Sequence, residues 1–237
     1  MRDLFLVFDT ETANTPKIDG QLDTTSGQVY DLGGQVIDSD GNIYDSFSLV
    51  NRDVFVDMPQ AMKEAYFAEK IPQYWREIWE GKRQLVDTWE MWRIFREMCK
   101  KWNVRAVVAH NANFDIRVLN ATIRYQTKSK KRYFLPYGTE VWDTMKMAKD
   151  TICALASYHA FCVENGYMTK HKTPQVRKTA EILWRFLTGD NTFEEEHTGL
   201  ADVAIESAIF AECVRRHKKM ERLADIDPEE VEKRWVL

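Results

Sequence analysis

Two carboxylates directly follow an apolar stretch near the start of the chain. Residues 4–8 are all apolar, which is typical of a central strand buried on both faces, and Asp9 and Glu11 come next. In an extended chain these two side chains point to the same face, about 7 Å apart. Burying two charges of one sign is costly unless they are paired or bound to a metal. We therefore expect this strand end to form half of a divalent-cation site.

Two further carboxylates lie where helices are expected to begin. Residues 104–109 predict a short buried strand, and Asn113 is a good N-cap, so Asp115 falls in the first turn of a helix. Asp202 opens another helix, which we expect to run to about residue 216. Taken alone, Asp115 is explained by the attraction of a carboxylate to a helix N-terminus. Because ligand sites in α/β folds lie beyond the strand ends, all four carboxylates are candidates for one common site.

A histidine precedes the last of these carboxylates by five residues. Five helical residues would place His197 and Asp202 roughly 140° apart, so the two cannot share one helix face. With Thr198 as N-cap, His197 instead belongs to the incoming loop and can fold back beside Asp202. Taken alone, His197 is better explained by pairing with the acidic residues 194–196.

Together, four carboxylates and a histidine are suited to phosphodiester hydrolysis. Hard cations such as Mg²⁺ prefer carboxylates and leave positions open for phosphate oxygens. Two such ions about 4 Å apart stabilise the attacking and leaving oxygens of an in-line displacement. A histidine that titrates near neutrality can take the proton from the attacking water.

The remaining pattern predicts a mixed α/β fold. Residues 28–37 and 43–50 predict strands joined by a turn, and Gly33-Gly34 suggests a bulge or a close backbone approach. These strands and the first one should form an antiparallel meander. With residues 104–109 and 140–143, we expect a five-stranded sheet with helices on both faces.

The helical segments complete the predicted domain. Residues 52–102 form a Trp-rich helical segment, in which one helix begins near Pro59 and a longer one covers residues 84–102. Residues 145–165 and 176–187 are also expected to be helical. We expect one domain over residues 1–217 and a charged C-terminal helix or tail over residues 218–237.

Composition and charge limit the classes of partner. No apolar stretch approaches the ~20 residues of a membrane span. The formal charge of −4 gives no general attraction to nucleic acid. Contacts with a nucleic-acid strand would therefore be made by the basic turns at residues 128–132 and at Lys170 and Lys172. Both turns are equally explained as solvated loops. The four cysteines form no CxxC pair, which indicates reduced thiols and a cytoplasmic protein.

Three short stretches resemble the motifs of the DEDD exonuclease superfamily. They are residues 8–12 (Phe-Asp-Thr-Glu-Thr), 110–115 (His-Asn-Ala-Asn-Phe-Asp) and 197–202 (His-Thr-Gly-Leu-Ala-Asp). The DEDDy branch has a tyrosine where this chain has Thr198. The position of His197 resembles the DEDDh branch, which includes the epsilon proofreading subunit, RNase T and oligoribonuclease. The resemblance covers residues 1–217 in layout and is specific only at the motifs.

This resemblance implies a ribonuclease H-like fold and 3′-to-5′ hydrolysis that releases nucleoside monophosphates. It implies two Mg²⁺ ions, for which Mn²⁺ is expected to substitute. The ions would be bound directly by Asp9, Glu11 and Asp202, and by Asp115 partly through water, with His197 as the general base. It places four further residues against the substrate, with Thr10 and Thr12 at the terminal nucleotide and Asn111 and Phe114 near the scissile end.

One stretch differs from the family pattern, and one further carboxylate has two possible roles. Many DEDDh members continue the first motif with Thr-Gly, whereas this chain has Ala13-Asn14, which leaves the shape of the terminal-nucleotide pocket open. Asp143 resembles a position that is often acidic in the family, but capping of the following helix explains it at least as well.

The leading hypothesis is a 3′–5′ exonuclease that acts on the 3′ end of single-stranded DNA, in proofreading or end trimming, with a polymerase as a candidate partner. One alternative is an exoribonuclease of the RNase T or oligoribonuclease type, since nothing in the motifs reads a 2′-hydroxyl. Another is a non-catalytic accessory protein that binds a polymerase or nucleic acid. The complete set of carboxylates and the histidine argues against the last, because a binding module has no use for clustered negative charge.

Overall fold

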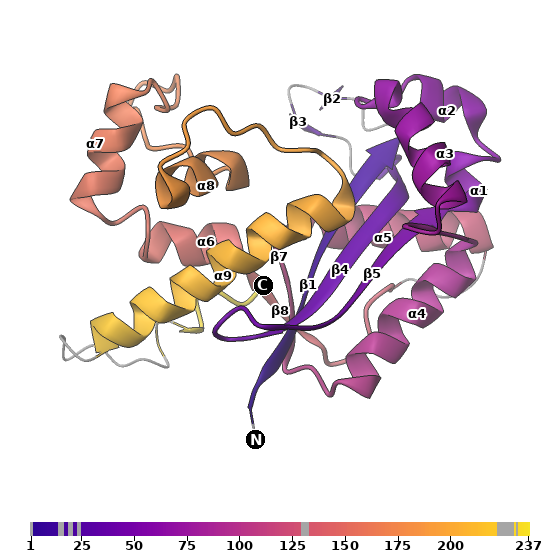
Figure 1. Ribbon diagram of the computed structural model, residues 1–237, viewed down its shortest axis with the longest axis horizontal. Helices are drawn as coiled ribbons and strands as arrows, with labels where there is room; N and C mark the ends of the chain where they lie inside the picture. Colours follow the sequence, from indigo (N-terminus) through magenta and orange to yellow (C-terminus); the bar gives the residue numbers. More distant parts are fainter. Residues whose placement is uncertain are drawn as a thin grey trace.

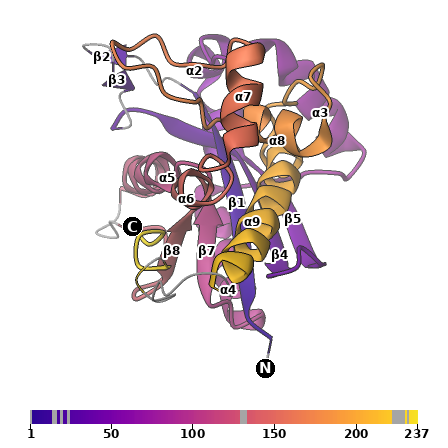
Figure 2. The same ribbon diagram turned by 90° about the vertical axis from the view of Figure 1, so that its left-hand side faces the viewer.

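The computed structural model describes residues 2–13, 17–18, 21–22, 25–128, 133–221, 230 and 232–237 (Figure 1). Its centre is a six-stranded sheet in the order β6-β5-β4-β1-β7-β8. Figures 1 and 2 show the long helix α9 running across this sheet, with α6, α7 and α8 gathered beside it. A separate two-stranded ladder joins β2 (Lys17–Ile18) to β3 (Gln21–Leu22).

The strand order confirms the predicted meander and shows that the two later strands extend it in parallel. Strand β1 (Leu4–Ala13) is antiparallel to β4 (Gln28–Asp38), which is antiparallel to β5 (Ile43–Asn51). On its other side β1 is parallel to β7 (Ala106–Ala109), and β7 to β8 (Glu140–Asp143). The carboxyl ends of β1, β7 and β8 therefore lie at the same edge of the sheet.

The sheet has one strand more than the five predicted. Strand β6 (Gln84–Val86) pairs in parallel with β5, in a stretch where the sequence predicted the start of a helix. The helix there, α4 (Thr88–Lys101), begins later because the Asp87 side chain caps it by accepting a hydrogen bond from the Glu90 backbone N–H. The residues before the cap are thus left free to extend the sheet.

The helices lie on both faces, as predicted. Besides α4 they are α1 (Arg52–Phe55), α2 (Pro59–Lys63), the 3₁₀ helix η1 (Ala68–Lys70), α3 (Ile71–Trp79), α5 (Ala112–Thr127), α6 (Thr144–Asp150), α7 (Ala156–Glu164), α8 (Ala180–Thr188) and α9 (Gly199–Glu221). Alternate side chains of β1 explain its unbroken apolar run. Phe5 and Val7 pack into the core that includes residues of α6, α8 and α9, whereas Leu6 and Phe8 pack into the core that includes residues of α4 and α5.

Two predicted helices differ in extent. The helix expected over residues 145–165 is divided into α6 and α7, because the chain turns after Asp150 and buries Ile152 completely in the core. Helix α8 begins later than the predicted residue 176, because Val176 forms a β-bridge with Met168. Gly166 follows the end of α7 with φ of 73°, as expected for a helix-terminating glycine.

The last residues of the chain lie against the sheet. Trp235 is buried beside Trp142, and its carbonyl oxygen accepts a hydrogen bond of 3.0 Å from the Asp143 N–H. Val236 forms a bridge with Trp142 in β8. Across the described ranges, no helix combines the length and the apolar content that crossing a membrane requires.

Candidate active site

The predicted site residues converge on one cavity. It has a volume of about 1230 Å³ and lies beside the second half of β1 and the start of α5. The structure places Asp115 just behind its lining, where the carboxylate accepts a hydrogen bond of 2.7 Å from the Thr10 hydroxyl. All the other predicted site residues line the cavity: Asp9, Thr10, Glu11, Thr12, Asn111, Phe114, His197 and Asp202.

Strand β1 does not end before its carboxylates. It continues to Ala13, with Asp9 opposite Gly33 and Glu11 opposite Asp31 on β4. Because Asp9 and Glu11 are two residues apart in a continuous strand, their side chains leave the same face. The register with β4 shifts only after Glu11, so both carboxylates are held by the regular ladder.

Two glycines allow the start of α9 to rest directly on β4. A Cβ atom on Gly33 would lie 2.2 Å from the carbonyl carbon of Gly199, and one on Gly199 would lie 2.6 Å from the Gly33 nitrogen. The close backbone approach predicted at Gly33 is thereby confirmed. It brings the first turns of α9, and with them Asp202, to the carboxylates of β1.

The start of α5 differs from the prediction. The helix begins at Ala112, so Asn113 is not its N-cap, and Asn111 precedes it in the left-handed region with φ of 64°. The Asp143 carboxylate accepts a hydrogen bond of 3.2 Å from the Asn111 N–H and one of 2.9 Å from the Met145 N–H. Asp143 thus caps α6 and fixes the turn that precedes α5.

His197 lies between the Glu11 and Asp202 carboxylates on one side and the Glu181 and Glu195 carboxylates on the other. A ring nitrogen of His197 and one oxygen each of Glu11 and Asp202 lie within 4.8 Å of one another. Its Nδ1 atom is also 3.9 Å from Glu195, so the predicted pairing with residues 194–196 exists beside the predicted site geometry. The ring stacks on Phe67, with the two centroids 4.3 Å apart.

Burial dominates the electrostatics of the cavity. Burial, followed by repulsion from Asp202, raises the pKa of Glu11 to about 9. Burial likewise raises the pKa of Asp115 and of Asp202 to about 7, and that of Asp9 well above its ordinary value. These shifts mean that, in the described part of the chain, too little positive charge lies near the carboxylates to hold all of them ionised.

The donor set fits a hard divalent cation. Its ligand atoms are carboxylate oxygens, which Mg²⁺ and Mn²⁺ prefer. The Oδ1 atom of Asp202 is buried and has no hydrogen-bond partner among the described residues. Buried polar atoms normally have a partner, so this oxygen is consistent with a ligand position.

One carboxylate of the cavity was missed by the sequence analysis. Glu206 is 4 % exposed, and its Oε2 atom accepts a hydrogen bond of 3.2 Å from the His110 N–H. Burial and repulsion from Asp115 raise its pKa well above the ordinary value. The sequence contains a signal for this residue, because Glu206 follows Asp202 by four positions and so lies on the same helix face.

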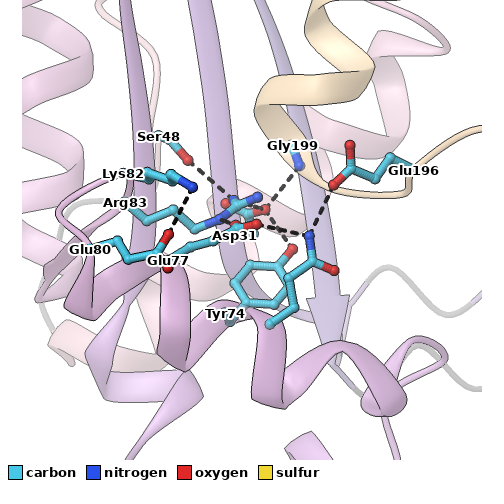
Figure 3. A network of polar contacts seen from close by, with 10 residues as sticks. Asp31, Ser48, Tyr74, Glu77, Glu80, Lys82, Arg83, Glu196 and Gly199 are labelled. Atoms are coloured by element: carbon cyan, nitrogen blue, oxygen red, sulfur yellow. Dashed lines mark hydrogen bonds and ion pairs between the residues drawn. The ribbon is translucent and has the colours of Figure 1, made fainter.

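A second missed residue, Asp31, ties three elements together. Its Oδ2 atom accepts hydrogen bonds of 2.6 Å from the Tyr74 hydroxyl, 2.8 Å from Arg83 and 2.9 Å from the Gly199 N–H. Figure 3 shows these groups converging on Asp31 from α3, from the segment before β6 and from the start of α9. Asp31 sits opposite Glu11, so this network fixes the side of the cavity nearest that carboxylate.

The structure describes only some of the basic residues that were predicted to contact nucleic acid. Residues 129–132 lie outside the described part of the chain. Lys170 and Lys172 are exposed and are not among the residues that line the cavity.

No protein-family model and no curated protein sequence matches this chain. Its fold is nevertheless similar to that of solved exonucleases. A product-bound exonuclease I matches with a TM-score of 0.54 and 15 % identity, over 94 % of this chain and 46 % of that one. Exonuclease I with the inhibitor BCBP matches with a TM-score of 0.53 and 16 % identity, over 95 % and 47 %.

The E. coli exonuclease I in complex with a 5cy-dT13 oligonucleotide matches with a TM-score of 0.52 and 14 % identity, over 94 % of this chain and 42 % of that one. The chain thus spans less than half the length of these proteins. At such identity the similarity confirms the predicted mixed α/β, ribonuclease H-like fold, which this chain shares with exonuclease I.

Proposed function

We propose that this protein is a metal-dependent 3′–5′ exonuclease that hydrolyses the phosphodiester bonds of single-stranded DNA. The observation that carries the proposal is the meeting of Asp9, Glu11, Asp202 and His197 in one cavity, with Asp115 directly behind Thr10. The fold shared with exonuclease I supports the same reaction class. The 3′-to-5′ direction rests on the resemblance of the three motifs to the DEDDh branch.

Asp9, Glu11 and Asp202 would hold the metal, and Asp115 would complete the site. Two bound Mg²⁺ or Mn²⁺ ions would supply Lewis-acid stabilisation of the attacking and leaving oxygens. The four carboxylates come from β1, α5 and α9, so the geometry does not depend on a single element.

His197 would take the proton from the attacking water. Burial, together with the nearby Lys70, lowers the pKa of His197, so the imidazole is neutral at pH 7 and able to accept a proton. Its position beside Glu11 and Asp202 places this base next to the groups that would hold the metal.

The remaining predicted residues would hold the end of the strand. Thr10 and Thr12 line the cavity beside the carboxylates, where they would contact the terminal nucleotide. Phe114 lines the cavity and is half-buried, so its ring is available to stack on a base. A polymerase partner and a cytoplasmic location stay predictions from the sequence.

A nuclease assay with three substrates tests the proposal. End-labelled single-stranded DNA, single-stranded RNA and duplex DNA are incubated with Mg²⁺, with Mn²⁺ or with a chelator. We expect a ladder of products shortened from the 3′ end of single-stranded DNA with either metal, and none with the chelator. Asp9→Ala should reduce the rate to that of the chelated protein, whereas Asp190→Ala, at an exposed carboxylate outside the cavity lining, should retain it.

The outcomes separate the competing functions. Shortening of RNA alone would transfer the proposal to an exoribonuclease of the RNase T type. If no substrate is shortened, or if shortening persists in Asp9→Ala, the protein is not an exonuclease that uses this cavity.

A further inference from the structure

The Trp-rich segment, residues 52–102, had no role in the motifs, yet the structure places its first part, between β5 and β6, against the loop that carries His197. Gln73 on α3 donates a hydrogen bond of 2.9 Å to Glu196, the residue before His197. Tyr74 on the same helix donates to Asp31, which in turn accepts from the Gly199 N–H, two residues after His197 (Figure 3). Helix α3 therefore holds the loop on both sides of the histidine.

Between these two attachments, Phe67 contacts the histidine itself. The rings of Phe67 and His197 are 4.3 Å apart at their centroids, and their planes differ by 16°, which is a stacked arrangement. One face of the imidazole is thus covered by the phenyl ring. The ring nitrogens lie at the imidazole edge, and one of them lies within 4.8 Å of Glu11 and Asp202 oxygens.

His197 needs such support because its backbone is strained. Its φ of 49° lies in the left-handed region, which is costly for a residue with a side chain and persists only where the surroundings impose it. The side chain is 36 % exposed, so general burial does not fix its orientation. The described contacts that can limit rotation of the imidazole are the stacked Phe67 ring and the Glu195 carboxylate, 3.9 Å from Nδ1.

Phe67 is not explained as an ordinary core residue. Among the described residues, it belongs to none of the three apolar clusters of the molecule. Its ring contacts are with His197, with Tyr66 at 4.8 Å between centroids and with the ammonium of Lys70 at 5.4 Å from the ring centroid. Two of these partners, His197 and Tyr66, line the cavity together with Phe67.

We propose that Phe67 is a positioning residue that holds the His197 imidazole toward Glu11 and Asp202. Its effect on catalysis rests on the proposed function, in which His197 is the general base. The aromatic face also suits both protonation states of His197, because a ring stacks on the neutral imidazole and attracts the protonated one. The substitution Phe67→Tyr should therefore preserve the contact, whereas an aliphatic side chain of similar volume should not.

Kinetics of the full chain on single-stranded DNA test the catalytic consequence. We expect Phe67→Leu to lower kcat by about 10- to 100-fold, as a misplaced catalytic group does, with KM within about twofold of wild type. Phe67→Tyr should restore kcat to within about threefold of wild type. Trp79→Leu, at an 89 % exposed aromatic residue of the same segment, is the matched control and should leave kcat unchanged.

A double-mutant cycle shows whether Phe67 acts through His197. In the His197→Ala background, Phe67→Leu should have no further effect on kcat, because the imidazole that it positions is gone. Equal losses in both backgrounds would overturn the proposal, as would a wild-type kcat in Phe67→Leu with an unchanged unfolding temperature.

Proton NMR of the imidazole tests the contact independently of activity. A phenyl ring stacked on His197 shifts its ring protons upfield, and Phe67→Leu should move these signals toward those of a free histidine. Phe67→Tyr should keep them upfield. If the protein shortens no substrate but its His197 ring signals change in Phe67→Leu and not in Phe67→Tyr, the positioning contact stands and the proposed function fails. If the signals are the same in wild type and Phe67→Leu, the positioning contact is wrong.

Discussion

Glu206 adds a buried carboxyl group near Asp9 that the three motifs do not contain. Burial and the charge of Glu206 are the two largest causes of the raised pKa of Asp9. Repulsion of this kind costs stability in the metal-free protein and is relieved when a cation binds. At the residue scale, Glu206 should therefore act as a part of the cation site.

We predict that Glu206→Gln weakens cation binding and stabilises the metal-free protein. The amide keeps the size of the side chain and removes its charge. The Kd for Mn²⁺ should rise by about 10-fold, as is common when a group supporting a metal site is changed. Calorimetric titration with Mn²⁺ and thermal unfolding in chelator measure the two effects. Glu212→Gln, on the same helix but paired with Arg215 and Arg216, is the control. Unchanged Mn²⁺ affinity in Glu206→Gln would remove this carboxylate from the site.

The individual site residues differ in how far the sequence could reveal them. Asp9, Glu11, Asp115 and Asp202 were found because each lies at or near the end of an apolar element, where packing alone does not explain a carboxylate. Asp31 was not found, because its partners Tyr74, Arg83 and Gly199 lie 43, 52 and 168 residues away in the chain. Such contacts exist only once the sheet and helices have assembled.

At the scale of elements, the site depends on how closely α9 approaches the β1–β4 pair. Gly33 and Gly199 touch through their backbones, and a Cβ on Gly199 would also lie 3.3 Å from the Asp9 carbonyl oxygen. The distance between Asp202 on α9 and the carboxylates of β1 is therefore set by the absence of side chains at two positions.

We predict that Gly33→Ala destabilises the protein by about 1–3 kcal/mol, because its methyl group would overlap the Gly199 backbone. The start of α9 would have to move away from β4, so cation affinity and nuclease activity should both fall. Chemical denaturation and Mn²⁺ titration measure these changes.

Gly34→Ala is the matched control for this prediction. The added methyl group would approach the ring of Phe47, at 2.3 Å, rather than a backbone atom. That ring is buried in the core that includes residues of α4 and α5, not against α9, so stability should fall while cation affinity should be retained. Equal effects of the two variants on cation affinity would show that the contact of Gly33 with Gly199 does not position Asp202.

The elements themselves were predictable where their patterns were long. The meander of β1, β4 and β5 follows from apolar runs and turn residues of the first fifty positions. Strand β6 was missed because it has only three residues and forms by pairing with β5, after the helical segments that separate them in sequence. The break between α6 and α7 likewise follows from tertiary burial of Ile152.

On the scale of the whole molecule, the cavity links protonation, cation binding and stability. In the metal-free protein the pKa of Glu11 is about 9 and that of Asp202 about 7, whereas unfolded glutamate and aspartate titrate near pH 4. Between about pH 5 and pH 9 these carboxyl groups therefore bind more protons in the native state than in the unfolded state. Their contribution to stability falls as pH rises through this range.

Histidines and cysteines also titrate, and they limit the pH range in which the effect of the carboxylates on stability is clearest. Burial and nearby Lys70 lower the pKa of His197, and burial lowers that of His110, so these two residues make stability rise with pH below about pH 6.5. Burial raises the pKa of Cys99 and Cys213 to about 12, which adds to the fall in stability above about pH 8. The cysteine contribution should not depend on a cation in the cavity, so a comparison with and without metal isolates the carboxylates.

We predict that the free energy of unfolding in chelator falls between pH 7 and pH 9, and that saturating Mg²⁺ flattens this dependence. A bound cation keeps the cavity carboxylates ionised, so they no longer take up protons in the native state. Denaturation curves at several pH values, with chelator and with Mg²⁺, measure both slopes. Asp202→Asn should reduce the difference between them, because it removes one titrating ligand, whereas Asp190→Asn should not. Identical slopes with and without Mg²⁺ in the wild-type protein would mean that no cation binds among these carboxylates.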